Sequence, residues 1–412
     1  MAMKQTQTKM FDFADVGLDF CAGSKNLFPD RFKKMLVLGY NEQTVSSVAI
    51  TGNQVVLTYG VSHGYVADRV LKINSGALAT INNGEFWIDA VTTNTVTLTI
   101  DGAPTSVVGG FITKIAPLGW ELVYELNNIH IYKFRAMNDS DLYLRLCFQN
   151  NISYKNMVSP CIGKTVDLAA GIIADSFAYS ANASLQTPST GLCWLFAQDA
   201  NSIYNNYTYA QGLNVFGKGL VVGSKYHFAV MNNNGRSSAV AATEGAMAGG
   251  IFPTACFDSE VLSYPVLLGL ISITASSSTN IDTYALGVAY LGNQRVRFNK
   301  SNSATGALFI TPQAASSFLP SNLDGFNTTV AENLSLYDFT STQFLGYVSG
   351  GVFACNYATS NAPTLQKSLS PILTSDIDLN NVIAVHALTF ASVSLANAVF
   401  LAFPVEEIKI GA

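Results

Sequence analysis

Charged residues are scarce in this chain of 412 residues. Lys, Arg, Asp and Glu make up 12% of it, about half the share found in ordinary soluble domains. The net charge of −5 and the pI near 5.4 argue against a nucleic-acid partner, because phosphate binding relies on concentrated Lys and Arg. The polar surface must then consist mostly of Asn, Ser, Thr and Gln. Such surfaces are typical of β-proteins in large assemblies, where long charged side chains would have to be desolvated; a solvated monomer is the alternative.

Signals of export, membrane insertion and metal binding are also missing. Residues 1–8 have no apolar segment of the kind that a signal peptide needs. The most apolar run, 382–403, is interrupted by polar residues, so we expect two buried strands there and no membrane insertion. The cysteines show no C-x-x-C spacing, which predicts reduced, mostly buried thiols, no zinc site and no cofactor. They are Cys21, Cys147, Cys161, Cys193, Cys256 and Cys355.

Catalytic motifs are weak. Gly163-Lys164-Thr165 resembles the end of a phosphate-binding loop, but Val158 stands where that loop requires Gly. The chain has four histidines, and none lies at metal-ligand spacing to another or beside a nucleophile-elbow Ser. We expect His63 to cap backbone groups in a turn and His130 to occupy a partly buried strand position. The other two are His227 and His386.

Three pairs of neighbouring carboxylates invite comparison with glycosidases. A glycosidase holds its two carboxyl groups about 5–10 Å apart across a cleft, which closeness in sequence does not show. We therefore expect surface loop acids, and the sequence predicts that the protein is not an enzyme. The pairs are Asp139/Asp141, Asp376/Asp378 and Glu406/Glu407.

The clearest structural signal is a β-hairpin within residues 84–102. Polar and apolar residues alternate strictly from Thr95 to Ile100, as in a half-buried strand. Residues 86–90 alternate in the same way, and Thr92-Thr93-Asn94 is the expected turn between the two strands.

Further strands precede and follow this hairpin. A second hairpin is expected from Val45–Ile50 and Gln54–Tyr59 around a Thr51-Gly52-Asn53 turn, with more strands near residues 69–73 and 111–115. About six strands between residues 35 and 116 suffice for a small barrel or sandwich.

The rest of the chain is also β-rich. Alternation predicts strands at 129–134 and 142–148, and apolar runs predict strands at 266–274 and 284–290. Residues 235–250 are expected to form a long loop. The predicted fold class is therefore all-β, with a small N-terminal β-barrel or sandwich module followed by a larger antiparallel β-sandwich region. The predicted divisions are an arm at 1–32, the module at 33–116 and the β-sandwich region at 117–412, which could contain two subdomains.

Two groups of aromatic residues are candidates for an interaction surface. One group lies in the arm, whose aromatics would be poorly placed in water, so we expect the arm to be a short strand or a segment that docks on a neighbouring subunit. The other group lies in a Tyr/Asn run, which also fits an ordinary β-loop. The candidates are Phe11, Phe13, Phe20, Tyr204, Tyr207 and Tyr209.

Two blocks of the sequence resemble virion structural proteins of tailed bacteriophages. The first resembles a small β-module with an SHG…NG…VT.NT pattern, and consists of Ser62-His63-Gly64, Leu71-Lys72-Ile73, 81–86 and 91–98. The second resembles a phage structural β-sandwich family, through Trp120, Tyr132-Lys133-Phe134, Tyr143-Leu144-Arg145-Leu146, Trp194, Asp199, Tyr204 and Phe216-Gly217. Together the blocks cover roughly residues 60–230.

The resemblance implies a structural component of the tail, baseplate or neck of a phage particle. Its partners would be copies of itself and other virion proteins, and it would be located in the virion, assembled in the host cytoplasm. Alternatives are a receptor-binding or fibre-tip protein that recognises host-surface glycan, a capsid decoration protein and, with less support, a polysaccharide depolymerase.

Overall fold

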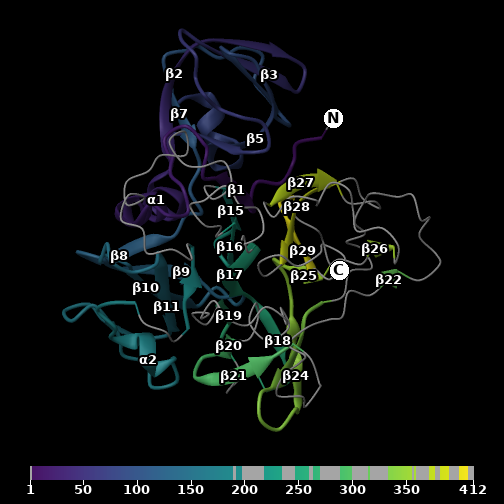
Figure 1. The fold of residues 1–412 in the computed structure, drawn as a ribbon. Coiled ribbons are helices and arrows are strands. Elements are labelled where there is room, and N and C mark those ends of the chain that lie inside the picture. Colours follow the sequence, from purple (N-terminus) through teal and green to yellow (C-terminus); the bar gives the residue numbers. More distant parts are fainter. Residues whose placement is uncertain are drawn as a thin grey trace, which may run out of the picture.

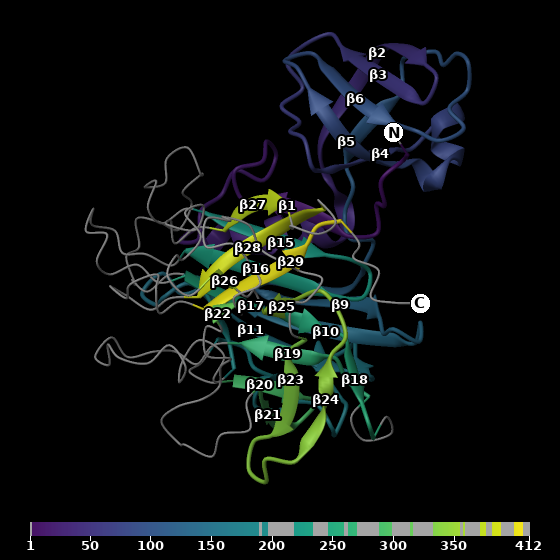
Figure 2. The same cartoon turned by 90° about the vertical axis from the view of Figure 1, so that its right-hand side faces the viewer.

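The structure is a computed structural model that describes residues 2–188, 192–196, 218–233, 246–258, 263–269, 288–298, 314–315, 333–354, 357–358, 371–375, 381–388 and 399–406. Strands dominate these residues and the helices are short, so the chain has the all-β fold that its sequence predicts. A small closed barrel stands at one end of a larger body made of packed sheets (Figures 1 and 2).

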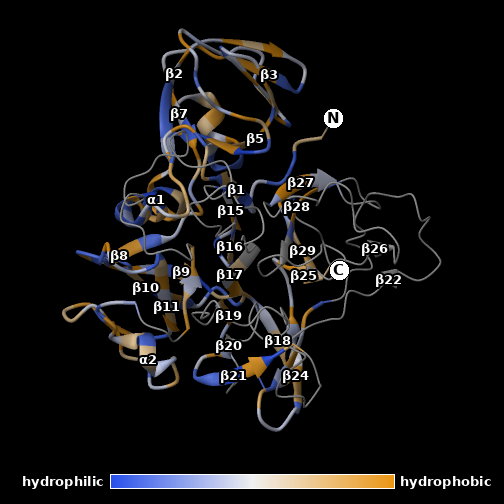
Figure 3. Cartoon of the chain, in the orientation of Figure 1, coloured by the Kyte–Doolittle hydropathy of each residue, from blue (hydrophilic) through white to orange (hydrophobic). Residues whose placement is uncertain are grey.

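The barrel contains six antiparallel strands. Each strand is hydrogen-bonded to two neighbours in the closed order β2-β3-β6-β5-β4-β7, so the barrel has no open edge. Hydrophobic and hydrophilic residues alternate along these strands (Figure 3), which fills the interior with apolar side chains. The strands are β2 (Tyr40–Thr51), β3 (Gln54–Tyr59), β4 (Val70–Ile73), β5 (Glu85–Val91), β6 (Thr95–Thr99) and β7 (Ile112–Ile115). Two short 3-10 turns, η3 (Ala77–Thr80) and η4 (Asn82–Gly84), precede β5.

The predicted β5–β6 hairpin is confirmed. Val96 and Leu98 point into the barrel and are fully buried, whereas the threonines between them are partly exposed. The turn is held by Thr92, whose Oγ1 accepts hydrogen bonds from the backbone N–H groups of Asn94 and Thr95 at 3.4 and 3.1 Å. The predicted hairpin at residues 45–59 is also confirmed, as β2 and β3.

Three sheets form the body, and a ten-stranded sheet lies in the middle. Its order is β1-β15-β16-β17-β19-β20-β21-β23-β24-β18. In chain order these strands are β1 (Lys9–Asp12), β15 (Gly219–Gly223), β16 (Phe228–Asn233), β17 (Ala246–Phe252), β18 (Thr254–Cys256), β19 (Val266–Gly269), β20 (Val288–Leu291), β21 (Gln294–Arg297), β23 (Ser335–Asp338) and β24 (Phe344–Val348).

A smaller sheet packs on each face of the middle sheet. One has five strands, β8 (Glu121–Leu126), β9 (Ile129–Arg135), β10 (Asp141–Phe148), β11 (Met157–Gly163) and β14 (Trp194–Leu195). The other has four, β25 (Phe353–Ala354), β27 (Ile372–Ser375), β28 (Val382–Leu388) and β29 (Val399–Pro404). The remaining short elements are β12 (Val166–Asp167), β13 (Ile172–Ile173), α2 (Ser180–Ala183), β22 (Ala314–Ala315) and β26 (Tyr357–Ala358).

Alternation along the middle strands supplies two separate cores. On β16, Phe228 and Val230 join the core shared with the five-stranded sheet, whereas Ala229 and Met231 join the core shared with the four-stranded sheet. Successive side chains of a strand point to opposite faces, so a middle strand buried on both faces is apolar throughout. The apolar stretch at 382–403 likewise contains the two strands predicted there, β28 and β29.

One predicted loop is partly wrong. Residues 246–250 of the expected 235–250 loop belong to β17, which pairs with both β16 and β19. Small residues here are needed for packing, because a Cβ on Gly249 would lie 2.4 Å from Trp194 Cδ1. The low-charge, Gly-rich composition therefore reflects close approach of a strand to a ring.

The N-terminal segment forms part of the body and also part of its connection to the barrel. Strand β1 is the edge strand of the middle sheet, where it pairs with β15. The chain then turns into short helical elements, η1 (Lys25–Leu27), α1 (Phe28–Lys33) and the π-helical η2 (Lys34–Leu38), before entering the barrel at β2. Aromatic rings of this segment pack on one another and on the body, in the contacts Phe13–Phe20, Phe20–Phe28, Phe28–Phe196 and Phe32–Phe148.

A buried ion pair fastens this segment to the barrel. Asp15 accepts hydrogen bonds from Arg69 Nε at 2.8 Å and Nη2 at 2.9 Å, and from the Tyr40 hydroxyl at 2.7 Å. Both ionic side chains are almost inaccessible, with exposed fractions of 6% for Arg69 and 7% for Asp15. Two further ion pairs, Lys9–Glu85 and Lys4–Glu406, tie the same segment to the barrel and to the chain just after β29. We call these contacts the N-terminal clamp.

Candidate functional site

The predicted aromatic interaction residues of the arm lie in the core. Phe11, Phe13 and Phe20 are fully buried within the chain itself, so their side chains are not available at the surface. The other three candidates, Tyr204, Tyr207 and Tyr209, lie outside the described residues.

The histidines predicted as structural residues are buried. His63 caps the backbone as predicted: its Nδ1 accepts the Tyr65 N–H at 2.9 Å, and its Nε2 lies 3.2 Å from the Thr95 carbonyl oxygen. His130 lies on β9 and is 1% exposed, with Nδ1 2.7 Å from the Tyr132 hydroxyl. Burial lowers the pKa of His130 to about 4, against an opposing effect of Glu125.

The remaining histidines are also inside the body. His227 Nδ1 lies 2.8 Å from Ser224 Oγ in the turn between β15 and β16, and burial lowers the His227 pKa to about 4. His386 is fully buried on β28. Neither side chain lies in a surface hollow.

The described carboxylates of the three sequence pairs are engaged in surface ion pairs. Asp141 pairs with Arg135 at 2.6 Å, Asp139 pairs with Lys225 at 3.3 Å, and Glu406 pairs with Lys4 at 2.6 Å. Glu407, which follows Glu406, and the whole Asp376/Asp378 pair lie outside the described residues.

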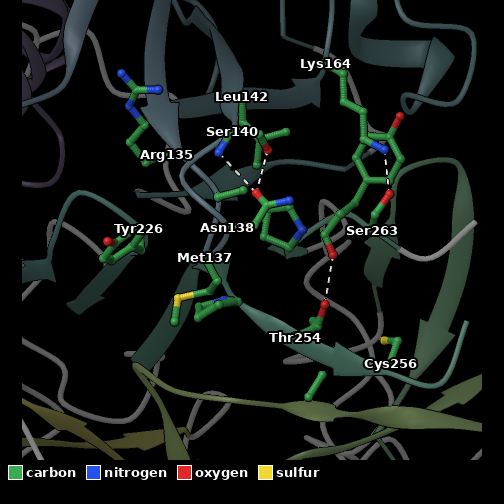
Figure 4. A pocket seen from close by; sticks show the side chains of 15 residues that line it. Arg135, Met137, Asn138, Ser140, Leu142, Lys164, Tyr226, Thr254, Cys256 and Ser263 are labelled. Atoms are coloured by element: carbon green, nitrogen blue, oxygen red, sulfur yellow. Dashed lines mark hydrogen bonds between the residues drawn. The ribbon is translucent and has the colours of Figure 1, made fainter. Parts of the chain in front are cut away.

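Lys164 brings the Gly-Lys-Thr motif to a surface hollow. The motif lies where β11 ends, and the Lys164 side chain reaches Ser263 Oγ at 2.5 Å, with its ammonium 4.5 Å from the centre of the Tyr264 ring. A hollow of about 620 Å³ opens beside these groups, between the β9–β10 turn and the β17–β18 region (Figure 4). Its lining residues are Arg135, Ala136, Met137, Asn138, Ser140, Leu142, Lys164, Tyr226, Pro253, Thr254, Ala255, Cys256, Ser263, Tyr264 and Pro265.

A second hollow of about 420 Å³ shares Lys164 and Tyr264 with the first. Phe177 lies on its wall with 58% of the residue exposed, so an aromatic ring is available to a ligand there. We call the two hollows together the Lys164 cleft.

Asp175 holds the shared wall of the Lys164 cleft in place. Its Oδ2 accepts hydrogen bonds from the Tyr264 hydroxyl at 2.6 Å and the Lys164 N–H at 2.7 Å, and its Oδ1 accepts the Phe177 N–H at 2.9 Å. Burial raises the pKa of this carboxyl, but these hydrogen bonds outweigh burial and leave the pKa of Asp175 below its usual value. Asp175 is therefore ionised at neutral pH and its oxygens are occupied by the wall.

Arg145 anchors the same wall from inside the body. The guanidinium is fully buried and donates to the carbonyl oxygens of Gly171, Asn182 and Leu185 at 2.8, 3.3 and 2.6 Å. These three bonds fix the segment that carries Asp175 and the second hollow. This arginine belongs to the Tyr-Leu-Arg-Leu block of the phage resemblance, and its position in the core gives that block a structural role.

The larger hollow of the Lys164 cleft combines neutral polar side chains with a positive charge. In the part of the chain that the structure describes, no carboxylate oxygen lies within 4 Å of the Lys164 ammonium, whose contacts are with a hydroxyl and a ring. In the sequence, Lys164 stands out only as part of a Gly-Lys-Thr motif, which lacks the Gly that a phosphate-binding loop requires at position 158. No local pattern could reveal the cleft, because its partners Ser263 and Tyr264 are distant in the chain.

A second surface feature lies at the end of the body opposite the barrel (Figure 1). Three aromatic rings, on β23, on β24 and just after β18, contact one another there, and a fourth exposed aromatic residue, Tyr347, lies on β24. We call these four residues the tip patch: Phe257, Tyr337, Phe344 and Tyr347. The ring centres of Phe257 and Phe344 are 5.5 Å apart, and those of Tyr337 and Phe344 are 5.3 Å apart. Phe257 is 79% exposed and Tyr347 is 41% exposed, which is unusual for clustered aromatics on a soluble monomer.

The described residues lack the features of two other kinds of site. They contain no cluster of three or more His, Cys, Asp or Glu side chains arranged to hold a metal ion. Among the same residues, no helix has the length and apolarity needed to cross a membrane. Comparison with known proteins found no family model and no curated protein that matches this chain.

Proposed function

We propose that this chain is a structural component of a tailed-phage particle, in the tail, baseplate or neck. It would assemble through contacts with copies of itself and with other virion proteins. The proposal is supported by the resemblance of residues 60–230 to two virion blocks, and by an architecture suited to a rigid building part.

The observation that carries the proposal is the tip patch. Phe257, Phe344 and Tyr347 expose 79%, 38% and 41% of their surface. Aromatic residues are enriched where proteins contact one another, and they supply much of the binding free energy at such contacts. A neighbouring subunit that covers the tip patch would remove this apolar surface from water.

The N-terminal clamp supports the same proposal. It joins barrel and body by the buried Asp15–Arg69 pair as well as by apolar contacts of Met10, Val70 and Trp87. An assembly part must hold its neighbours at a fixed spacing, and a barrel fastened in this way acts as a rigid extension of the body.

The test has two arms. Mass spectrometry and cryo-EM of particles purified from the producing cells should find the chain at a stoichiometric, symmetric position. Sedimentation velocity of the purified chain should show self-association that weakens in the variant Phe257→Ser/Phe344→Ser. Tyr154→Ser is the matched control, because Tyr154 is 54% exposed but lies away from the tip patch.

Two results together would contradict the proposal. One is a chain that stays monomeric at high concentration, and the other is its absence from every purified particle. An effect of Tyr154→Ser equal to that of the tip-patch variant would instead remove the tip patch as its support.

A further inference from the structure

We infer that the Lys164 cleft binds a glycan chain with carboxylate-bearing sugars, and that Lys164 pairs with the sugar carboxylate. This is a binding activity beyond the proposed structural role, and it does not depend on that role. The argument rests on charge, on the kind of polar groups present and on the division of the cleft into two hollows.

The charge argument concerns the two cations of the larger hollow. Arg135 is already paired with Asp141 at 2.6 Å. Among the described residues, the Lys164 ammonium contacts the Ser263 hydroxyl and the Tyr264 ring, and no acidic residue lines the larger hollow. Asp175 lines the smaller hollow and interacts electrostatically with Lys164. An anionic ligand group would therefore find an ammonium that no described carboxylate contacts directly, and charge-assisted hydrogen bonds are the strongest of the polar contacts.

The polar groups of the larger hollow suit a ligand rich in hydroxyl groups. Neutral side chains with an amide or an aliphatic hydroxyl group line it, namely Asn138, Ser140, Thr254 and Ser263. Figure 4 shows them around the opening, with Asn138 bonded to Ser140. Amide and hydroxyl groups each both donate and accept, as sugar hydroxyls do. An extended peptide would instead be held chiefly through backbone groups at a sheet edge.

Apolar surfaces provide the remaining contacts that a sugar ring needs. Met137, which is 60% exposed, lies in the larger hollow, and Phe177, which is 58% exposed, lies in the smaller one. The C–H face of a pyranose is apolar and packs on such surfaces, while its edge carries the hydroxyls. Mixed walls of this kind are typical of small-molecule sites, and volumes of about 620 and 420 Å³ fall in the usual range of roughly 300–1,000 Å³.

Two hollows that share a wall fit neighbouring units of one chain. Lys164 and Tyr264 line both, so one cation lies close to both positions. A linear oligomer that occupies both hollows gains contacts that a single sugar cannot make, because the second unit binds without a further loss of translational freedom.

Isothermal titration calorimetry with the full chain tests the inference. The probes are glucuronic, galacturonic, mannuronic and N-acetylneuraminic acid, their linear tetramers, the neutral galactose tetramer and tetraglutamate. We expect at least one acidic tetramer to bind about tenfold or more tightly than both its monomer and the neutral tetramer.

Two variants and one control locate the binding. Lys164→Met should weaken the acidic tetramer about tenfold or more, whereas Phe177→Ser should weaken the tetramer and leave the monomer unchanged. Lys114→Met is the control, because it removes the same charge on the barrel, where Lys114 lies 3.4 Å from Glu42. Equal melting temperatures of variants and parent would show that folding is intact.

Four results would overturn the inference. They are no binding of any sugar acid at concentrations on the order of 10 mM, equal binding of acidic and neutral tetramers, unchanged binding in Lys164→Met, and tighter binding of tetraglutamate than of every sugar acid. The last would assign the cleft to an acidic peptide. None of these results depends on whether the chain is found in particles.

Discussion

Replacing Asp15 tests whether the N-terminal clamp holds barrel and body together. Its carboxylate accepts four hydrogen bonds, two from Arg69, one from the Tyr40 hydroxyl and one from the Asp12 N–H. Asp15→Asn keeps the shape of the side chain but removes the charge, so the buried Arg69 guanidinium loses its counter-ion. Leaving one member of a buried pair uncompensated costs about 3–5 kcal/mol.

Amide hydrogen exchange is the suitable measurement, because the clamp can open without global unfolding. The Phe13 N–H, which donates to the Gly219 carbonyl oxygen at 3.0 Å, reports on that local opening. We expect its opening free energy to fall by about 3 kcal/mol or more in Asp15→Asn, while amides of β10 remain unchanged. Glu42→Gln is the control, because it breaks an exposed pair worth less than about 1 kcal/mol.

A double-mutant cycle decides whether the ion pair itself is responsible. Asp15→Leu/Arg69→Met removes both charges and leaves apolar side chains, so it should be less destabilised than the sum of its single variants by about 2–3 kcal/mol. Additivity within about 0.5 kcal/mol would refute the reasoning, because the two residues would then act independently.

Three further predictions follow from buried groups. The pKa of His130 is lowered by burial to about 4, so between pH 6.5 and pH 4 the unfolded chain binds a proton that the folded chain does not. The free energy of unfolding should therefore fall by up to about 3 kcal/mol as the pH is lowered through this range. Urea unfolding at pH 7 and 4.5 should show a smaller loss for His130→Phe than for the parent chain. Arg145→Met leaves three carbonyl groups without their hydrogen-bond donor, so amide hydrogen exchange in residues 171–185 should accelerate by about tenfold or more. An unchanged exchange rate there would contradict the anchoring role of Arg145. Gly249→Ala places a Cβ 2.4 Å from an indole carbon, whereas the Cβ of Gly60→Ala meets nothing within 4 Å. Gly249→Ala should therefore lower the free energy of unfolding by about 1–3 kcal/mol, and Gly60→Ala should leave it nearly unchanged. Thermal melts of the two variants would show the difference.

The barrel could be predicted from the sequence because its signals are local. The alternation from Thr95 to Ile100 and the Thr92-Thr93-Asn94 turn before it depend only on neighbouring residues. The six strands also follow one another along the chain, with only loops and the short turns η3 and η4 between them. The apolar composition of residues 382–403 likewise predicts that β28 and β29 are buried. Alternation does not reveal that the middle strands serve two cores, because a strand covered on both faces has no polar face.

The role of the first 32 residues could not be predicted, since it depends on distant partners. Phe11 and Phe13 read as exposed aromatics when only their neighbours in the sequence are considered. They are buried because β1 pairs with β15 and because the aromatic rings of α1 pack beside them. The Lys164 cleft also depends on residues that are distant in the sequence, because Ser263 and Tyr264 reach Lys164 only through the packing of two sheets.

The pairing of β1 with β15 also sets an order of events during synthesis. Strands β2 to β7 are complete once residue 115 has left the ribosome, so the barrel can fold early. Strand β1 has emerged before them, yet its partner at Gly219–Gly223 is made much later. At about 5–20 residues per second, β1 waits roughly 10–40 s. Until Gly219–Gly223 is made, β1 lacks the strand that pairs with it, so we expect the nascent N-terminus to bind chaperones.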